Sequence, residues 1–331
     1  MSLEAHYRVI REGAAIGAVA SRGQIALTGR DRATYLQGLL TNDIAALQAG
    51  AGCYAAWLTA QGRMLTDMHV LQSDAMLLLD VPSALVEATV ARLEQFIFSE
   101  DVQVSSLAGA LTAVSVHGPA AAGVLEQVLT GAAGLAGWPE YRHAPLQFGS
   151  EPAVVTRIDQ LGVPGYCVYL EPSREASFHD ALVARGAVEA GTDAIAAARV
   201  EAGYPVFGVD MTEDTIPLEA GIEPRAISLT KGCYVGQEVI IRVLHRGHGR
   251  VAKRLVGLAV EGAAPAGGAR IFADGTPEAR TIGAVTSAAT SPRLGAVALG
   301  YVHRDSAAPG SVVSIEVGGG RSAARVTALP M

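Results

Sequence analysis

The amino-acid sequence predicts an α+β protein that ends in a small antiparallel β-barrel. Up to about residue 250, strand-like runs and helical patterns alternate irregularly, which is typical of an α+β architecture and not of a doubly wound parallel sheet. Beyond that point only short β-rich runs remain, separated by glycine-rich turns. The 331 residues are enough for two or three domains, and we expect a larger domain at 1–249 and a barrel domain at 250–331.

The first part of the chain predicts a strand, a helix, a hairpin with a third strand, and a second helix. Residues 24–28 alternate in hydrophobicity, and Asp31 is a typical N-cap for the helix that follows. A turn at 60–63 between two β-rich runs indicates the hairpin. The predicted elements are a strand at Gln24–Thr28, a helix at Asp31–Leu40, strands at Cys53–Thr59, Met64–Leu71 and Met76–Val81, and a helix at Pro82–Phe98.

The next part continues to alternate between strands and helices. Thr192 is a typical cap for a helix that Gly203 stops. The stretch from Gly131 to Gly149 is rich in Gly, Ala and Pro, which predicts a surface loop between two halves of the larger domain. The predicted elements are strands at Leu111–His117, Ala153–Ile158 and Tyr166–Leu170, and helices at Pro119–Leu129, Ser173–Arg185 and Asp193–Ala202.

Six short runs after residue 250 predict the strands of the barrel. Gly-Gly, Asp-Gly, Pro-Gly and Gly-Gly-Gly turns separate them. The predicted strands are Val251–Val260, Ala269–Ala273, Thr281–Ala288, Ala296–Val302, Val312–Val317 and Arg321–Ala328.

Composition excludes several classes of protein. Half of the residues are hydrophobic and 17% are charged, which excludes a mainly disordered chain. The cysteines Cys53, Cys167 and Cys233 form no C-x-x-C pair, so neither a disulfide framework nor a zinc site is supported. His245 and His248 have helical spacing but no further ligand at a recognisable offset, so we expect no metal there. No apolar run approaches the roughly 18 residues of a membrane span, and we expect a cytoplasmic protein.

Most of the candidate catalytic and binding residues lie in the run from Lys231 to Glu238 (Lys-Gly-Cys-Tyr-Val-Gly-Gln-Glu). It sets Cys233 between two glycines, beside a lysine and ahead of a helix predicted by apolar residues at 239, 240, 243 and 244. A cation and a helix N-terminus can lower the pKa of a thiol, so that the nucleophilic thiolate is populated near neutrality. A second interpretation stays open, in which Cys233 is a small buried residue and the glycines only make a turn.

A basic segment begins within this run. Six basic residues lie between Lys231 and Arg254 against one acidic residue, Glu238, a local charge of 6 − 1 = +5 in a protein of net charge −7. The overall charge argues against binding of nucleic acid over the whole surface. The segment itself indicates either a site that attracts anions or a solvated helix face.

The octet resembles the signature of the YgfZ-type folate-binding proteins, relatives of the glycine-cleavage T-protein (aminomethyltransferase) that act in iron–sulfur cluster assembly or repair. The resemblance covers nearly the whole chain. Further matching segments are 27–31 and 35–43 at the start, Ala198–Pro205 with its Arg-x-Glu-Ala-Gly element, and 291–292 and 299–302 in the barrel.

This resemblance implies a T-protein-like domain of two subdomains followed by a barrel, and tetrahydrofolate or a one-carbon derivative as cofactor. It implies Cys233 as the working thiol, with Lys231 favouring its thiolate, and iron–sulfur client or assembly proteins as partners. Arg199 is expected close to the pterin, with a helix-surface salt bridge as the alternative. The full set of implied folate or partner contacts is Arg199, Tyr234, Gln237, Glu238 and Arg242.

The chain departs from the T-protein pattern at three places. Cys167 stands where the T-protein has an acidic residue, and Gly318–Gly320 stands where it has an arginine. The strand Met76–Val81 leads into Pro82 without the aspartate that the T-protein uses in methylene transfer. Loss of a carboxylate that orients the transferred group costs more rate than affinity. We therefore expect no ordinary aminomethyltransferase activity.

Two other functions stay open. One is a true folate-dependent aminomethyltransferase or demethylase. The other is a tRNA-modification factor, since a related folate-binding domain occurs in a tRNA-modifying GTPase, and the basic residues from Arg242 to Arg254 are its only support.

Overall fold

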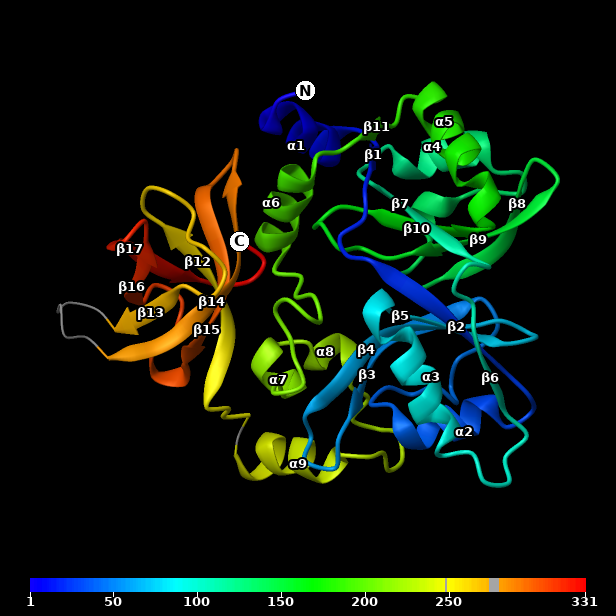
Figure 1. The fold of residues 1–331 in the computed structure, drawn as a ribbon, viewed down its shortest axis with the longest axis horizontal. Helices are drawn as coiled ribbons and strands as arrows, with labels where there is room; N and C mark the ends of the chain where they lie inside the picture. Colours follow the sequence, from blue (N-terminus) through cyan, green and yellow to red (C-terminus); the bar gives the residue numbers. More distant parts are fainter. Residues whose placement is uncertain (248, 274–279) are drawn as a thin grey trace.

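The computed structural model describes residues 1–247, 249–273 and 280–331, so His248 of the histidine pair lies outside the described residues. Two β-sheets with their helices form one side of the molecule, and a closed six-stranded barrel forms the other (Figure 1). All strand pairs of the barrel are antiparallel. The predicted fold class, an α+β region followed by a small antiparallel barrel, is confirmed.

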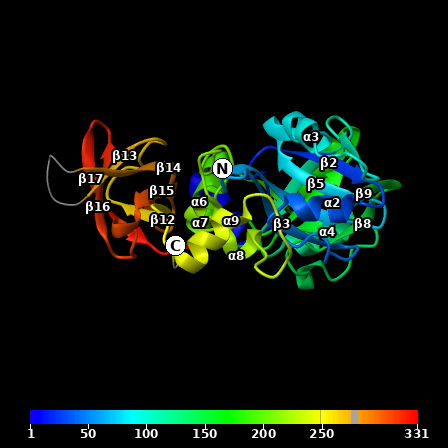
Figure 2. The same cartoon turned by 90° about the horizontal axis from the view of Figure 1, so that it is seen from below.

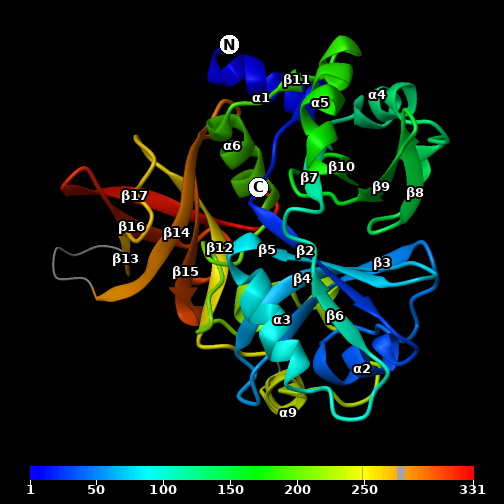
Figure 3. The same cartoon turned by 45° about the vertical axis from the view of Figure 1, so that its right-hand side comes forward.

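The first sheet has five antiparallel strands in the order β3-β4-β5-β2-β6. Helices α2 and α3 pack on one face, where alternate residues such as Ile25 and Leu79 form a core with them. The opposite face carries Gln24, His69 and Asp80, and it borders the second sheet (Figure 3). The elements are β2 (Arg22–Thr28), α2 (Arg32–Leu39), β3 (Ala51–Leu58), β4 (Met64–Gln72), β5 (Leu77–Pro82), α3 (Val86–Glu94) and β6 (Gln103–Ser106), of which only β6 was not predicted.

The second sheet has six strands in the order β11-β1-β7-β10-β9-β8, with α4 and α5 packed on it. The predicted loop at Gly131–Gly149 is wrong, because β8 (His143–Phe148) runs through it and pairs with β9. Strand β8 is an edge strand, and edge strands tolerate a proline such as Pro145. The other elements are β1 (Ala15–Ile16), β7 (Thr112–His117), α4 (Ala121–Val128), β9 (Glu151–Arg157), β10 (Gly165–Leu170), α5 (Glu175–Ala184) and β11 (Val188–Glu189).

Helices α6 to α9 lie between the two sheets and the barrel (Figure 2). Helix α6 (Thr192–Ala202) ends at Gly203, whose φ of 66° is left-handed, as predicted. Its N-cap is Gly191, one residue before the predicted Thr192. Near its end, Glu201 accepts hydrogen bonds from four side chains and so joins the N-terminal helix α1 (Leu3–Glu12) to the barrel. The donors are Tyr7, Arg11, Ser291 and Arg293.

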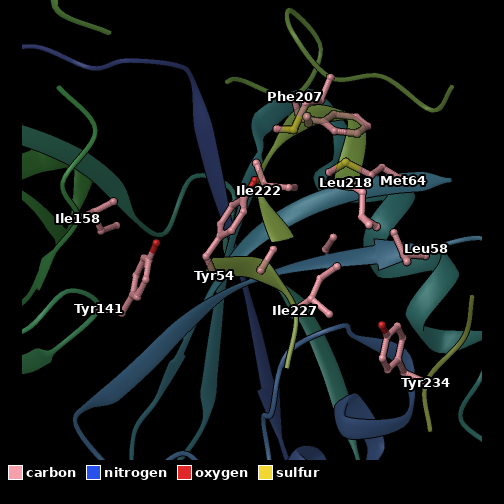
Figure 4. Packing of buried hydrophobic residues seen from close by; sticks show 14 of the residues in the cluster. Tyr54, Leu58, Met64, Tyr141, Ile158, Phe207, Leu218, Ile222, Ile227 and Tyr234 are labelled. Carbon is pink, nitrogen blue, oxygen red and sulfur yellow. The ribbon is translucent and has the colours of Figure 1, made fainter. Parts of the chain in front are cut away.

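The segment after α6 packs on the first sheet. Leu218 of α7 (Pro217–Ala220) and Ile222, just before α8 (Glu223–Ala226), belong to one buried cluster with Tyr54 of β3 (Figure 4). Helix α9 (Gln237–Ile241) follows and continues into a π-helical turn, which confirms the helix predicted after the cysteine motif.

The barrel closes in the order β12-β15-β14-β13-β16-β17. Each of its six predicted strands is present within a few residues of its expected ends. They are β12 (Lys253–Val260), β13 (Arg270–Ala273), β14 (Thr281–Ser291), β15 (Gly295–His303), β16 (Val312–Val317) and β17 (Gly320–Thr327). Across the described ranges of the chain, no helix has the length and apolar character needed to cross a membrane.

Candidate functional site

Lys231 anchors the motif loop to the end of α2. Its ammonium donates hydrogen bonds to the backbone carbonyls of Gln37 (2.6 Å), Leu40 (2.5 Å) and Asn42 (3.0 Å). The last carbonyls of a helix lack partners within the helix, and a lysine has three N–H donors to offer. Lys231 therefore caps α2 at Gln37 and Leu40 and also holds Asn42 in the segment that follows the helix. Its predicted effect on the reactivity of Cys233 stays a prediction and would act through charge alone.

Cys233 is exposed on this loop, which excludes its interpretation as a buried residue. The following Tyr234 is buried beside the Lys231 ammonium, which lies 5.1 Å from the ring centre. Gly236 has a φ of 84°, and a Cβ there would lie 2.5 Å from the carbonyl oxygen of Thr59 in the β3–β4 hairpin. The loop thus presents its thiol to solvent while its neighbours hold the backbone against the first sheet.

The remaining predicted contacts of the motif lie on α9 and the turn that continues it. Gln237 is half-buried, whereas Glu238 and Arg242 are exposed. Arg250 and Arg254 of the basic segment are exposed as well. A tRNA contact on these residues stays a prediction, and so do their contacts with folate.

Arg199 is buried between α6 and the barrel. Its guanidinium donates hydrogen bonds to the Asp210 carboxylate (2.6 Å), the Tyr204 carbonyl (2.9 Å) and the Ser287 hydroxyl (2.6 Å). The alternative of an exposed helix-surface salt bridge is wrong, because both Arg199 and Asp210 are buried. Arg199 also lines a cavity of about 320 Å³ that shares residues 19–21 with the larger cavity described next. Its predicted contact with a pterin stays a prediction.

A cavity of about 670 Å³ lies between the two sheets. Strands β2, β4 and β5 form one wall, and β7 and β10 form the other. This volume lies within the range of small-molecule binding sites in proteins. The polar, ionisable and thiol side chains in its walls include Arg22, Gln24, His69, Asp80, Gln160 and Cys167.

The pairing of β2, β5, β4 and β3 places four polar side chains in a row on the cavity wall that the first sheet forms. Gln24 on β2 lies opposite Asp80 on β5, and Asp80 lies opposite His69 on β4. His69 in turn lies opposite Tyr54 on β3. Directly opposed residues share one face of a sheet, so these four side chains stand side by side although they are far apart in sequence.

Asp80 is the centre of a buried hydrogen-bond network. It accepts hydrogen bonds from Gln24 Nε2 (3.0 Å), Arg22 Nε (3.0 Å) and His69 Nδ1 (2.9 Å). Arg22 Nη1 also donates to Asp67 (3.2 Å). Asp67 and Asp80 are each only 2% exposed, and a buried carboxylate requires such compensation by charge and hydrogen bonds.

These contacts fix the protonation states in the cavity wall. Burial opposes the ionisation of Asp80, but Arg22 and the donors of His69 and Gln24 outweigh it and hold its pKa below the ordinary value. Burial and then the charge of Arg22 lower the pKa of His69, so the imidazole is neutral at neutral pH. With Nδ1–H donated to Asp80, Nε2 accepts from the hydroxyl of Tyr204 at 3.3 Å. The wall therefore combines an ionised carboxylate, a guanidinium and a neutral imidazole.

Cys167 lies in the opposite wall, on β10. Burial, and secondly the charge of Asp80, raise the pKa of its thiol to about 12, so it is a neutral thiol at physiological pH. By the family resemblance, Cys167 replaces an acidic residue of the T-protein. The structure supplies two carboxylates in and behind the facing wall, Asp67 and Asp80. Both are hydrogen-bonded to neighbouring side chains, and the expectation of no ordinary aminomethyltransferase activity stays a prediction.

Sequence analysis did not identify Arg22, Asp67, His69 or Asp80 as site residues. A signal was available: Asp67 and His69 lie two residues apart in an apolar strand, and Asp80 follows three leucines. Charged residues are almost never fully buried without partners, so their presence within apolar strands indicates a buried polar site.

Comparison with known proteins gives the family of this chain. The model of the GCVT N-terminal domain matches residues 1–231, and that of the glycine cleavage T-protein C-terminal barrel domain matches residues 253–331. The chain is 31% identical to the aminomethyltransferase of Rubrobacter xylanophilus, covering 91% of this chain and 79% of that protein. It is 27% identical to the aminomethyltransferase of Bacillus subtilis, with 96% and 87% covered. The crystal structure of the glycine cleavage system aminomethyltransferase T from Bartonella henselae is similar with a TM-score of 0.86 at 25% identity, covering 99% of this chain and 89% of that chain.

The fold is thus T-protein-like, with a mixed α/β N-terminal domain and a closed C-terminal barrel. The chain belongs to the glycine cleavage T-protein (GCVT) family.

Proposed function

We propose that the protein binds tetrahydrofolate, or a one-carbon derivative of it, in the cavity between the two sheets. The observation that carries this proposal is the buried row of Gln24, Asp80 and His69 in the wall of a cavity of about 670 Å³. A pterin is flat and carries N–H donors and a carbonyl acceptor along one edge. A carboxylate next to a carboxamide offers the complementary acceptors and donors in one place.

The donor set of the cavity fits such a ligand. Gln24 is 2% exposed and uses its Nε2 on Asp80. Its Oε1 accepts no hydrogen bond from any described residue and is therefore open to a donor on a ligand. Asp80 has lone pairs left after its three hydrogen bonds, because two carboxylate oxygens offer about four acceptor sites.

Bound tetrahydrofolate would carry the one-carbon unit. The residues of this chain would bind the pterin edge, orient it and exclude water. His69 is held between Asp80 and the hydroxyl of Tyr204, so its neutral ring is fixed in the cavity wall and both of its nitrogens are hydrogen-bonded.

Calorimetric titration with 5-formyltetrahydrofolate tests folate binding. We expect the wild type to bind and Gln24→Leu to weaken binding by about tenfold or more, since a hydrogen-bonding group of the site is lost. Gln127→Leu, an exposed position on α4, is the matched control and should bind like the wild type. Failure of the wild type to bind, or equal affinity of Gln24→Leu, contradicts the proposal.

We further propose, on the resemblance of its motif, that the protein supports assembly or repair of iron–sulfur enzymes with Cys233 as the working thiol. The exposure of Cys233 on an anchored loop supports access of a partner to its sulfur. In a strain that lacks the protein, Cys233→Ala should fail to restore iron–sulfur enzyme activity, whereas Cys53→Ala should restore it. Full restoration by Cys233→Ala contradicts this role.

A folate-dependent aminomethyltransferase or demethylase is the second candidate. The buried carboxylates of Asp80 in the cavity wall and of Asp67 behind it favour this candidate, and relatives of this chain are named aminomethyltransferase. Turnover of tetrahydrofolate with amine donors should then be lost in Asp80→Asn and retained in Cys233→Ala. Absence of turnover with every donor tested removes this candidate.

A further inference from the structure

A second cation, the partly buried Arg225, lies next to the polar row. Its guanidinium carbon is 4.2 Å from the ring centre of Tyr204 and 4.5 Å from that of Tyr54. Figure 4 shows Tyr54 on β3 within the core between the first sheet and α7–α8. Contacts with aromatic rings are attractive for a cation, but neither ring supplies an oxygen acceptor for the five N–H donors of the guanidinium.

The position of Arg225 is fixed without any ligand. Its backbone carbonyl accepts a hydrogen bond from Asn42 Nδ2 at 3.0 Å. The Tyr54 hydroxyl donates to Asp67 at 2.7 Å, which orients the first ring. The Tyr204 hydroxyl is hydrogen-bonded to His69, which orients the second ring. The guanidinium is therefore held in place before a ligand arrives, and such preorganisation lowers the entropic cost of binding.

Arg225 is charged and interacts electrostatically with Asp67 and Glu140, although neither forms an ion pair with it in the described part of the chain. Burial works to lower its pKa, but Tyr204, Tyr54, Tyr141 and Asp67 together raise it above the ordinary value. Among the described residues, no ion pair or side-chain hydrogen bond involves its guanidinium, and Asp67 is already occupied by Arg22 and Tyr54.

Its nitrogens are nevertheless not completely sealed from solvent. They are not among the described side-chain atoms that are both sealed from solvent and without a partner. An arginine that is charged, held between two rings and without a hydrogen-bond acceptor among the described side chains is suited to an anionic ligand.

We propose that Arg225 binds a carboxylate of the ligand that occupies the cavity. A carboxylate matches the guanidinium fork with two parallel N–H···O bonds, which lysine cannot provide. Arg225 lies behind the residues that line the cavity, and Tyr204 connects it to them, because the Tyr204 hydroxyl contacts His69 (3.3 Å) and Gln160 (3.5 Å), which both line the cavity. The inference rests on the proposed folate site and specifies its ligand further. The glutamyl end of a folate would supply the carboxylate, and a free amino acid would offer the same group.

Four probes separate these cases by calorimetry on the full-length protein. 5-Formyltetrahydrofolate carries both pterin and carboxylates, 6-hydroxymethylpterin carries only the pterin, p-aminobenzoylglutamate carries only the glutamyl end, and glutamate is the free amino acid. The variants are Arg225→Met, which removes the charge at similar length, and Arg225→Lys, which keeps the charge but not the fork. Arg63→Met is the control, because Arg63 is an exposed arginine paired with Asp214.

We expect Arg225→Met to weaken 5-formyltetrahydrofolate and p-aminobenzoylglutamate by about tenfold or more, since charged hydrogen bonds are lost. The affinity for 6-hydroxymethylpterin should stay within twofold. Arg225→Lys should lie between Arg225→Met and the wild type, and Arg63→Met should match the wild type. Binding of glutamate that depends on Arg225 as strongly as that of p-aminobenzoylglutamate would support the carboxylate site with a free amino acid as its source.

Two results overturn the inference while folate binding stands. One is an unchanged affinity of Arg225→Met for all probes, and the other is an equal loss for 6-hydroxymethylpterin, which would mean that Arg225 only shapes the site. The opposite case, in which the carboxylate site stands but folate binding fails, gives a different result. If p-aminobenzoylglutamate binds in an Arg225-dependent way and no pterin binds, the carboxylate site stands and the proposed folate function fails. Binding of none of the probes by the wild type contradicts both.

Discussion

The polar row in the cavity and the motif loop at the end of α2 are built in opposite ways. In the row and the ion pairs next to it, Arg22, Asp67 and Asp80 come from three separate strands, are largely buried and compensate one another. In the loop, consecutive residues lie together, and the thiol of Cys233 points to solvent. The comparison shows that a contiguous sequence motif can be needed for the conformation of a loop. The polar residues of a cavity, in contrast, are spread over several strands, and in the sequence these strands are recognised only by their apolar residues.

The two regions should therefore respond differently to mutation. Removal of one member of the row leaves its partners buried and uncompensated, so effects are large and depend on the other members. Removal of an exposed loop side chain leaves no buried partner uncompensated, so the free energy of unfolding should change little.

The largest effect is expected for Asp80→Ala. The change leaves the charge of Arg22 compensated by Asp67 alone and removes the acceptor of Gln24 and His69. We expect a loss of about 3–5 kcal/mol in the free energy of unfolding, measured by urea denaturation. Asp214→Ala, at an exposed pair with Arg63, should cost less than about 1 kcal/mol. Similar losses in both variants would remove the distinction between the two kinds of site.

The next effect concerns pH and extends the comparison to His117 on β7. Its Nε2–H donates to the Gly17 carbonyl, its Nδ1 has no partner among the described residues, and burial lowers its pKa to about 4. The unfolded chain therefore binds a proton near pH 6.5, before the folded one does, so stability is lost as the pH falls from about 6.5 to about 4.

For His117 alone this loss amounts to about 3 kcal/mol between pH 7 and pH 4. His117→Asn should remove most of that pH dependence, even if it lowers stability at pH 7. Urea denaturation of both proteins at pH 7 and pH 4 measures the difference. Parallel pH dependence in the wild type and the variant would show that His117 does not titrate as described.

A smaller effect is expected within the loop, at Lys231→Met. The carbonyls of Gln37, Leu40 and Asn42 lose their common donor, which should cost about 1–3 kcal/mol of stability. Arg242→Met, at an exposed position of the same motif region, should change stability by less than about 0.5 kcal/mol. If Lys231→Met is equally silent, the lysine does not anchor the loop.

The smallest effect on stability is expected for Cys233→Ser, within about 0.5 kcal/mol, together with a clear effect on thiol labelling. At pH 8 the native protein should react rapidly with a thiol reagent at one cysteine, because burial raises the pKa of both Cys53 and Cys167 to about 12. Cys233→Ser should abolish the rapid phase. Rapid labelling that persists in this variant would mean that another thiol is accessible.

The fold was predictable where each segment carries its own signal. Short β-rich runs between glycine-rich turns predicted all six barrel strands, and the helix before Gly203 ends at that left-handed residue as predicted. The amphipathic helix α1 was not recognised because only Tyr7 and Ile10 are buried on it. Strand β8 was hidden because an edge strand can be short of apolar residues and can include Pro145.

The candidate site was less predictable because it depends on register. Gln24, Asp80 and His69 become neighbours only when β2, β5 and β4 pair with one particular alignment. A shift of one residue would turn each side chain to the other face of the sheet. In the motif loop, Lys231 was easy to identify from the sequence because it belongs to a contiguous motif. Its hydrogen bonds to α2 could not be predicted, because they join residues that are far apart in the sequence.

A crystal structure of the protein with 5-formyltetrahydrofolate tests the central claim most directly. The account predicts that the pterin lies between the two sheets, with its donor edge within hydrogen-bonding distance of Gln24 and Asp80. A pterin bound at the loop of Cys233, or anywhere else outside the cavity between the sheets, would contradict it.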